Sequence, residues 1–233
     1  MPNIDVFILC GGKGSRLGNI CSNTPKPMLR IGKKPFLEII IRYLFIFGLR
    51  RFILGIGYKR ESIKRYFLKN PLPGIEIIFS SEDTPLGTGG AVKKAKKFIQ
   101  SDNFFVFNGD SFSRFNPAGF FSFHRKKNAL VSILLSKAKN SKDFGFVRKD
   151  RASHIIAFAE KKSSSVDSLV NCGVYIFNKK TFSLFPRKAN FSLEYDFFPI
   201  LAKKNIFGYN GSSGFIDIGT PKRLLQARHK RWI

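Results

Sequence analysis

The chain has 233 residues, of which 43% are hydrophobic, so it suits one α/β domain and is too apolar to be mainly disordered. Its 41 lysines and arginines against 15 aspartates and glutamates give a net charge of +26, which favours anionic partners such as nucleotides, phosphosugars, nucleic acid or anionic lipid. No run of about 18 uncharged apolar residues exists, so we expect no membrane-spanning helix.

The first half of the sequence alternates short apolar runs with longer segments of helical character. In chain order, the predicted strands are 4–10, 51–57, 74–80 and 104–108, and the predicted helices are 36–47, 60–68 and 89–99. Strands that alternate with helices through short loops form a parallel sheet, and such sheets bind ligands beyond the carboxyl ends of their strands. We therefore expect the loops after Cys10, Ser80 and Asn108 to share one edge of the sheet.

The second half changes character, because strand-like runs follow one another with only short turns between them. The predicted strands are 129–136, 145–148, 155–159 and 170–177, followed by helical segments near 192–203 and 220–231. The whole pattern predicts an α/β fold with a Rossmann-like, mixed but mainly parallel sheet flanked by helices. We expect one domain over residues 1–233, in which two halves, about 1–115 and about 116–233, share this sheet.

The strongest motif is a glycine-rich turn directly after the first predicted strand. Three glycines there let backbone N–H groups approach an anion closely, although the turn lacks both the P-loop ending and the dinucleotide-binding glycine spacing. The residues of this turn are Gly11, Gly12, Gly14, Ser15 and Arg16. Further along, Lys26 stands between two prolines, which restrict the local backbone and preset the direction of a second cation. Together these features predict an anion site rather than an ordinary tight turn.

Residues 10–17 and 24–28 resemble the signature of the sugar-1-phosphate nucleotidylyltransferases, and further family motifs follow in order along almost the whole chain. These motifs are Leu86-Gly87-Thr88-Gly89-Gly90-Ala91, Asn108-Gly109-Asp110, Phe144-Gly145, Glu160-Lys161, Asn171-Cys172-Gly173-Val174-Tyr175 and Phe215-Ile216-Asp217-Ile218-Gly219-Thr220-Pro221. Each piece is weak alone, whereas the ordered set is highly specific. The short length and residues 191–194 are most similar to guanylyltransferases acting on D-glycero-D-manno-heptose 1-phosphate, with mannose-1-phosphate guanylyltransferases and short uridylyltransferases as close neighbours.

The resemblance implies a reaction in which a sugar 1-phosphate oxygen attacks the α-phosphorus of a nucleoside triphosphate and pyrophosphate leaves. Such a transfer needs positioning and charge neutralisation more than covalent help. Asp110 and Asp217 are the expected ligands of a Mg²⁺ (or Mn²⁺) cofactor, because carboxylates held beside phosphate oxygens are typical ligands of these ions. The first half of the chain is then the nucleotide-binding half, and the second binds the sugar phosphate.

The resemblance also implies roles for the remaining motif residues. Arg16 and the amides of the glycine turn should hold the β- and γ-phosphates, and Lys26 should bridge the α-phosphate and the incoming sugar phosphate. Lys161 should hold the sugar phosphate, so the expected catalytic residues are Arg16, Lys26, Asp110 and Lys161. The expected nucleotide-binding residues are Gly11, Gly12, Gly14, Ser15, Glu82, Gly87, Thr88 and Gly89, and the expected sugar-phosphate-binding residues are Gly145, Glu160, Lys161, Asn171 and Gly173.

Glu82 carries the expectation about the base. It stands at the end of a predicted strand, four residues before Leu86, where relatives that use thymidine or uridine nucleotides commonly have Gln. A carboxylate there can accept both the N1–H and N2–H₂ donors of guanine, which no pyrimidine presents as a pair, and an unpaired buried charge penalises other bases. GTP is therefore the expected nucleotide, although some short uridylyltransferases also carry an acid at this place.

A second class of function stays open on the charge alone. A basic protein that binds nucleic acid or a membrane surface on the same fold would also be strongly cationic, and an AT-rich coding sequence would enrich Lys, Phe and Ile without any function. The aromatic residues lie in strand and helix patterns, which favours a place in the core. We expect no specific nucleic-acid partner.

The cysteines and the N-terminus bear on location. Cys10, Cys21 and Cys172 are odd in number and lack metal-site spacing, and the N-terminus lacks the basic start and apolar core of a secretory signal. We therefore expect a reducing, cytoplasmic location without a disulfide framework or a zinc site. A homodimer is one expectation for the assembly, and we expect no second, acetyltransferase activity, because no β-helix segment follows in this sequence.

Overall fold

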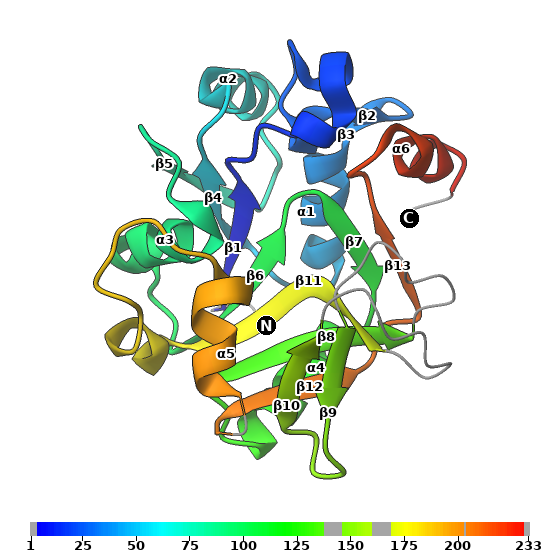
Figure 1. Ribbon diagram of the computed structural model, residues 1–233. Helices are drawn as coiled ribbons and strands as arrows, with labels where there is room; N and C mark the ends of the chain where they lie inside the picture. The colour runs from blue at the N-terminus through cyan, green and yellow to red at the C-terminus, as the bar shows by residue number, and fades with distance from the viewer. Residues whose placement is uncertain (1–3, 138–145, 160–168, 203, 231–233) are drawn as a thin grey trace.

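A central sheet organises the molecule, which is represented here by a computed structural model (Figure 1). The structure describes residues 4–137, 146–159, 169–202 and 204–230. Three positions expected in the sugar-phosphate site, Gly145, Glu160 and Lys161, lie outside these ranges.

The first half of the chain builds a parallel sheet through repeated crossovers. β1 pairs in parallel with β4 on one side and with β6 on the other, and β4 pairs in parallel with β5. The strands are β1 (Asp5–Cys10), β4 (Arg51–Ile56), β5 (Glu76–Ser81) and β6 (Asn103–Asn108), and the helices between them are α1 (Phe36–Ile46), α2 (Arg60–Lys69) and α3 (Gly87–Lys94). The predicted alternation and parallel pairing are therefore confirmed.

The second half extends the sheet with mainly antiparallel strands. β11 (Leu169–Asn178) runs antiparallel to β6 and to β8 (Val131–Lys137), and β12 (Ile206–Asn210) lies parallel to β8. The other elements there are β9 (Phe146–Lys149), β10 (Ile155–Ala159), α4 (Pro117–Lys126), α5 (Phe198–Leu201) and α6 (Pro221–Arg228). The sheet order is β10-β9-β11-β6-β1-β4-β5, and the expected mixed, Rossmann-like sheet is what the structure contains.

Two short ribbons stand apart from the main sheet. β2 (Arg30–Ile31) pairs with β3 (Lys34–Pro35), and β7 (Ser111–Arg114) pairs with β13 (Gly214–Asp217). The second ribbon joins the end of the parallel half to the end of the chain, and it positions part of the site described below.

Apolar side chains on the two faces of the sheet form two cores. Val6 and Ile8 pack on the face covered by α1 and α2, whereas Phe7, which points the other way, packs with α3 and α5 (Figure 1). Many of the 27 phenylalanines are in these cores; Phe104, for example, stacks on Phe177 with the ring centroids 5.7 Å apart. The aromatic residues serve packing, as the sequence pattern predicts.

Several element boundaries differ from the sequence prediction. The helix expected at 89–99 begins earlier, at Gly87, and ends in a 3₁₀ turn at Ala95–Phe98. The helix expected near 192–203 is a π-helical turn, Leu193–Phe197, followed by the four-residue α5. β12 is not predicted at all, because Gly208 weakens the strand pattern. A Cβ there would lie 2.5 Å from Leu135 Cδ1, so a larger residue would require the Leu135 side chain to shift.

Two further expectations concern the state of the cysteines and the presence of a membrane-spanning helix. Cys10, Cys21 and Cys172 are free and buried, and burial raises the pKa of the Cys10 thiol, which suits a packing role. Among the described residues, none of the helices combines the length and apolar character needed to cross a membrane.

His124, on α4, is a packed histidine. It is 1% exposed, and its ring nitrogens lie 2.9 Å from Ser132 Oγ and 3.1 Å from Asn103 Oδ1. Burial lowers its pKa to about 4. The neutral ring is therefore the form that the fold stabilises.

This burial predicts a pH-dependent stability. The unfolded chain takes up a proton at His124 near pH 6.5, whereas the folded protein resists protonation down to about pH 4. About 3 kcal/mol of unfolding free energy, fully present above pH 6.5, should be lost as the pH falls through this window. The free energy of unfolding, measured with urea at pH 7.5 and at pH 4.5, should fall less between these two pH values in His124→Gln than in the wild type. Equal falls in the two proteins would contradict the assignment of the pH dependence to His124.

Candidate active site

The glycine turn stands at the carboxyl end of β1, as predicted. Gly14 has φ +68°, and a Cβ there would lie 2.9 Å from Cys21 Sγ, so both backbone and space require glycine. Gly12 is exposed, and a Cβ on it would meet nothing within 4 Å, which leaves its backbone open to a ligand. A 3₁₀ turn, Ser15–Cys21, then carries Arg16 away from the strand.

Lys26 is the most enclosed cation among the described residues of the site. It is 7% exposed between Pro25 and Pro27, and its Nζ lies 2.5 Å from Asp110 Oδ2. Asp110 stands two residues after the end of β6, and its Oδ1 accepts a hydrogen bond from Ser111 Oγ at 3.0 Å. A buried ammonium requires a counter-charge of this kind, because an unpaired charge is costly to desolvate.

The β7–β13 ribbon brings the second predicted carboxylate to this pair. Asp217 stands opposite Ser111 in the antiparallel register, and the Ile218 amide donates to the Asp110 carbonyl at 2.9 Å. Gly219 N donates to Asp217 Oδ1 at 2.7 Å. Asp110 and Asp217, far apart in sequence, are therefore neighbours in the fold.

Arg16 converges on the same point. An added Cβ on Gly219 would lie 3.3 Å from both Arg16 Nη2 and Lys26 Nζ, so the two cations flank this glycine. Burial raises the pKa of Asp217, and the charge of Asp110 raises it further, against the opposing effects of the Gly219 amide and Arg223. The site thus holds two carboxylates that repel each other among several cations.

Two cavities meet at this cluster, and Asn108 and Asp110 line both. The larger, about 810 Å³, lies between the glycine turn, the end of β5 and the start of α3; its lining includes Gly11, Gly12, Lys26, Glu82, Gly87 and Thr88. The smaller, about 470 Å³, opens beside β11 and the β7–β13 ribbon; its lining includes Arg16, Asn171, Gly173, Tyr175, Glu194 and Asp217.

Most predicted site residues of the described ranges line one cavity or the other, with informative exceptions. Arg16 lines the smaller cavity, although we expected it to hold the β- and γ-phosphates in the larger one. Gly14 and Ser15 shape the turn but do not line either cavity. Gly89 is buried in α3, and its amide donates to the Phe191 carbonyl at 2.9 Å, so it packs rather than contacts a ligand.

Glu82 stands just past the end of β5 with its carboxylate in the larger cavity. Leu86 N donates to Oε2 at 3.3 Å, and Gly11 leaves room for the carboxylate, since an added Cβ would be 3.4 Å from Oε1. The nearby guanidinium of Arg60 bonds Asp83 Oδ1 at 2.6 Å and the Glu82 carbonyl at 3.1 Å. Burial raises the pKa of Glu82, which shows how poorly the site solvates this charge.

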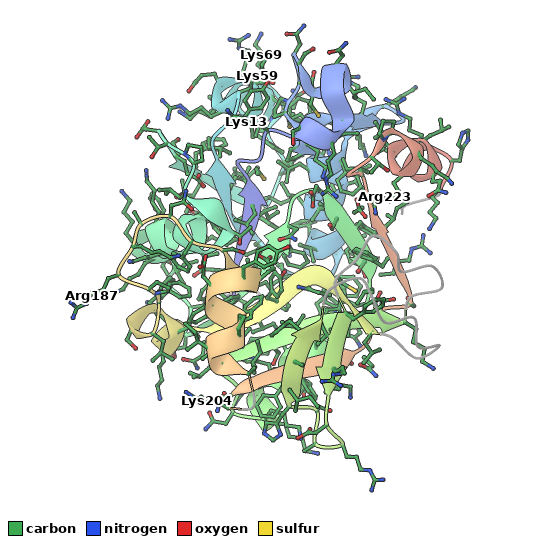
Figure 2. The ribbon with its side chains drawn as sticks, in the orientation of Figure 1. Lys13, Lys59, Lys69, Arg187, Lys204 and Arg223 are labelled. Carbon is green, nitrogen blue, oxygen red and sulfur yellow. The ribbon has the colours of Figure 1, made fainter. Side chains whose placement is uncertain are left out.

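Three residues of the smaller cavity had no predicted role. Tyr175 and Glu194 stand within motifs that the resemblance singled out. The hydrogen bonds that join Glu194 to Tyr175 and to Thr88 span 19 and 106 residues, so local spacing does not indicate them. Arg223, one turn into α6, lies with Nη1 3.1 Å from Asp217 Oδ2. In Figure 2 the Arg223 side chain lies beside α6 and Lys13 lies above β1, in the same upper part of the molecule.

The family follows from comparison with known proteins. The family described as "Nucleotidyl transferase" matches residues 5–231, and the chain therefore belongs to it. The sequence is 39% identical over 226 residues to D-glycero-alpha-D-manno-heptose 1-phosphate guanylyltransferase of Aneurinibacillus thermoaerophilus, covering 97% of each chain. It is 32% identical to mannose-1-phosphate guanylyltransferase of Mycobacterium tuberculosis, covering 96% of this chain but only 63% of that relative.

Solved structures agree with this assignment. HddC from Yersinia pseudotuberculosis superposes with a TM-score of 0.85 at 33% identity, covering 97% of this chain and 98% of that one. The same protein complexed with GMP-PN superposes with a TM-score of 0.83. The predicted family and fold class are therefore confirmed.

The position of Gly89 generates a packing prediction. A Cβ there would lie 2.1 Å from Phe191 Cε2, inside a buried contact that has no room for it. Gly89→Ala should lower the free energy of unfolding by about 1–3 kcal/mol, measured by urea denaturation. The control is Gly214→Ala, where a Cβ would meet nothing within 4 Å and stability should hold. Equal stability of both variants would show that the Phe191 contact is loose.

Proposed function

We propose that the protein transfers GMP from GTP to a manno-type sugar 1-phosphate, a heptose or mannose 1-phosphate, and so forms a GDP-sugar and pyrophosphate. One observation carries this proposal: a cavity beside a glycine-rich anion turn and a second cavity lined by cations and carboxylates meet at Asp110. Two substrates need such adjoining sites when a nucleotidyl group passes from one to the other. The guanylyltransferase relatives support both the reaction and its substrates.

In this proposal the larger cavity takes the nucleotide. The Gly11 and Gly12 backbone approaches the triphosphate, and the Glu82 carboxylate accepts the two donors of guanine. The smaller cavity takes the sugar phosphate, with Arg16 on its phosphate and Asn171 and the Gly173 backbone on its hydroxyl groups.

Lys26 has the position that the reaction needs. An oxygen of the sugar phosphate forms a bond to the α-phosphorus while the bond to the β-phosphate bridging oxygen breaks, and negative charge accumulates at the transferred group. The Nζ of Lys26 lies at the boundary of the two cavities, so we assign it the stabilisation of that charge. From the resemblance alone, we propose that Lys161 holds the sugar phosphate and that Glu160 and Gly145 also belong to its binding site.

Asp110 and Asp217 fit the divalent cation that we propose as cofactor. Both are carboxylates of the same cavity. Burial, and to a smaller extent the charge of Asp110, raises the pKa of Asp217, and a cation between or beside the two carboxylates would offset both effects. Among the described residues no cluster of three His, Cys, Asp or Glu side chains exists, so phosphate oxygens would complete the ligand set. When bound, Mg²⁺ would neutralise phosphate charge.

The distribution of the positive charge over the surface does not favour the alternative of a polyanion-binding protein. Labelled cations such as Lys69, Arg187 and Lys204 lie on widely separated parts of the surface (Figure 2). The aromatic side chains that could stack on bases are mostly in the two cores.

The function is tested by measuring pyrophosphate release for GTP, ATP, UTP, CTP and dTTP with mannose 1-phosphate, heptose 1-phosphate and glucose 1-phosphate. We expect the highest kcat/KM for GTP with a manno-type sugar. Glu82→Gln keeps the shape but replaces one acceptor by a donor, so it should lower kcat/KM for GTP by about 10-fold or more and narrow the gap to UTP. A wild type that prefers UTP would favour the uridylyltransferase alternative, and an unchanged base ranking in Glu82→Gln would remove Glu82 as the base reader.

The proposed metal site predicts that one substitution, Asp217→Asn, lowers activity without lowering stability. Asp217→Asn should lower kcat by about 100-fold or more, because it weakens the hold on the cation. Its free energy of unfolding at pH 8 should stay equal or rise, since a carboxylate with a raised pKa loses stability as the pH rises through that pKa. The control is the exposed Asp150, where Asn should leave kcat unchanged. EDTA should abolish wild-type activity and Mg²⁺ restore it; full activity in EDTA would refute the cofactor.

A further inference from the structure

One carboxylate, Glu194, lines the smaller cavity and reaches the larger one through the hydroxyl group of Thr88. Its Oε2 accepts hydrogen bonds from Thr88 Oγ1 and Ser192 Oγ, each at 2.8 Å, and its Oε1 accepts one from the Tyr175 hydroxyl at 3.2 Å. Thr88 lines the larger cavity, whereas Tyr175 lines the smaller. Glu194 is therefore a direct link between the proposed nucleotide and sugar-phosphate sites.

The link continues into the smaller cavity. The Tyr175 hydroxyl accepts a hydrogen bond from Asn171 Nδ2 at 3.0 Å, and Asn171 Oδ1 accepts one from Gly173 N at 2.8 Å. Burial raises the pKa of Tyr175 well above its ordinary value, and the Glu194 charge adds to this, so the hydroxyl stays a donor to Glu194. The orientation of Asn171 thus depends on a hydroxyl that Glu194 holds.

The link also continues toward the nucleotide. Thr88 is the second residue of α3, and its Oγ1 accepts a hydrogen bond from Leu193 N at 2.8 Å. The amides of Gly89 and Gly90 donate to the Phe191 carbonyl at 2.9 and 3.3 Å. The segment that leads to α5 therefore follows the start of α3 closely, as their neighbouring positions in Figure 1 show. A shift of the 87–88 turn on nucleotide binding would be transmitted to Glu194.

The local turn does not require the Glu194 side chain. Ser192 caps this turn, because its Oγ accepts from Glu194 N at 3.1 Å and from Tyr195 N at 3.2 Å. Asp196 Oδ2 accepts from Ser192 N at 2.7 Å, and its Oδ1 pairs with Lys188 at 2.8 Å. The backbone amides at the turn's start are satisfied by Thr88, Ser192 and Asp196, so the carboxylate of Glu194 contacts this turn only through the Ser192 hydroxyl and otherwise serves the two cavities.

We propose that Glu194 is a positioning residue that couples the two pockets, so that nucleotide bound beside Thr88 orients Tyr175 and Asn171 for the sugar phosphate. The inference rests on the proposed function, because it takes one substrate for each cavity. Coupling of this kind is reciprocal: each ligand raises the affinity for the other by the same factor, commonly between about 5- and 150-fold. With this coupling, each substrate binds more tightly when the other is already bound.

The test is isothermal titration calorimetry of the full chain with Mg²⁺. The nucleotide is guanosine 5′-(α,β-methylene)triphosphate, which cannot be cleaved at the reacting bond, and the second ligand is the sugar 1-phosphate that gives the highest kcat/KM. The ratio of the sugar-phosphate Kd without and with saturating nucleotide measures the coupling. We expect about 5-fold or more in the wild type and a ratio near 1 in Glu194→Gln. Because Glu194 itself lines the smaller cavity, the sugar-phosphate Kd alone can change in this variant, so the ratio within each protein is the measure of coupling. The nucleotide Kd measured alone should change less than about 3-fold.

Matched variants separate coupling from folding. Asp196→Asn alters a carboxylate of the same turn that reaches neither pocket-lining hydroxyl, so its Tm should fall while the ratio stays at the wild-type value. Thr88→Val removes the hydroxyl on the nucleotide side and should lose the coupling, whereas Thr88→Ser keeps a hydroxyl and should retain it. This pair tests the link even if Glu194→Gln folds poorly.

The outcomes distinguish this inference from the proposed function. A wild type that turns over GTP and sugar phosphate but has a ratio of 1 overturns the coupling alone. A wild-type ratio that Glu194→Gln and Thr88→Val both preserve also overturns the role of Glu194. A wild type that releases no pyrophosphate with any substrate pair overturns the proposed function, and the inference with it.

Discussion

Lys26 and Asp110 face each other at the boundary of two cavities, and the rest of the site is arranged around this ion pair. An ammonium that is 7% exposed needs a counter-charge at all times, whether or not a ligand is bound. In the proposed reaction, phosphate oxygens would take over that role from the carboxylate, so binding would exchange one ionic contact for another and leave little uncompensated charge. The two prolines beside Lys26 keep its position fixed during the exchange.

The sheet explains why local motifs predicted so much of the fold and the larger cavity. β1, β5 and β6 are parallel, so their carboxyl ends share one edge, and whatever follows each strand must meet there. Gly11 after β1, Glu82 after β5 and Asp110 after β6 could each be found from a short stretch of sequence. The inference that the strands are parallel was then enough to predict that these three residues converge.

Other parts of the site depend on contacts that no short stretch of sequence contains. The register of β7 with β13 places Asp217 opposite Ser111, and local patterns do not indicate which distant ribbons pair. Gly87 and Gly89 stand two positions apart in one motif, and an added Cβ on either would clash with Phe191, at 2.5 Å from its carbonyl oxygen or 2.1 Å from its ring, yet only Gly87 lines a cavity. Residue type alone cannot separate a glycine that lines a cavity from a glycine that only packs.

The β7–β13 ribbon also has a consequence for the order in which the site is made. The strands of this ribbon are about as far apart in sequence as β1 and β6, so loop closure alone does not decide which pairing forms first. Synthesis does impose an order, because β1, β4, β5 and β6 are made before β13. The parallel strands and Asp110 can therefore be in place while Asp217 has yet to be made, and the carboxylate pair is complete only after β13 has been synthesised.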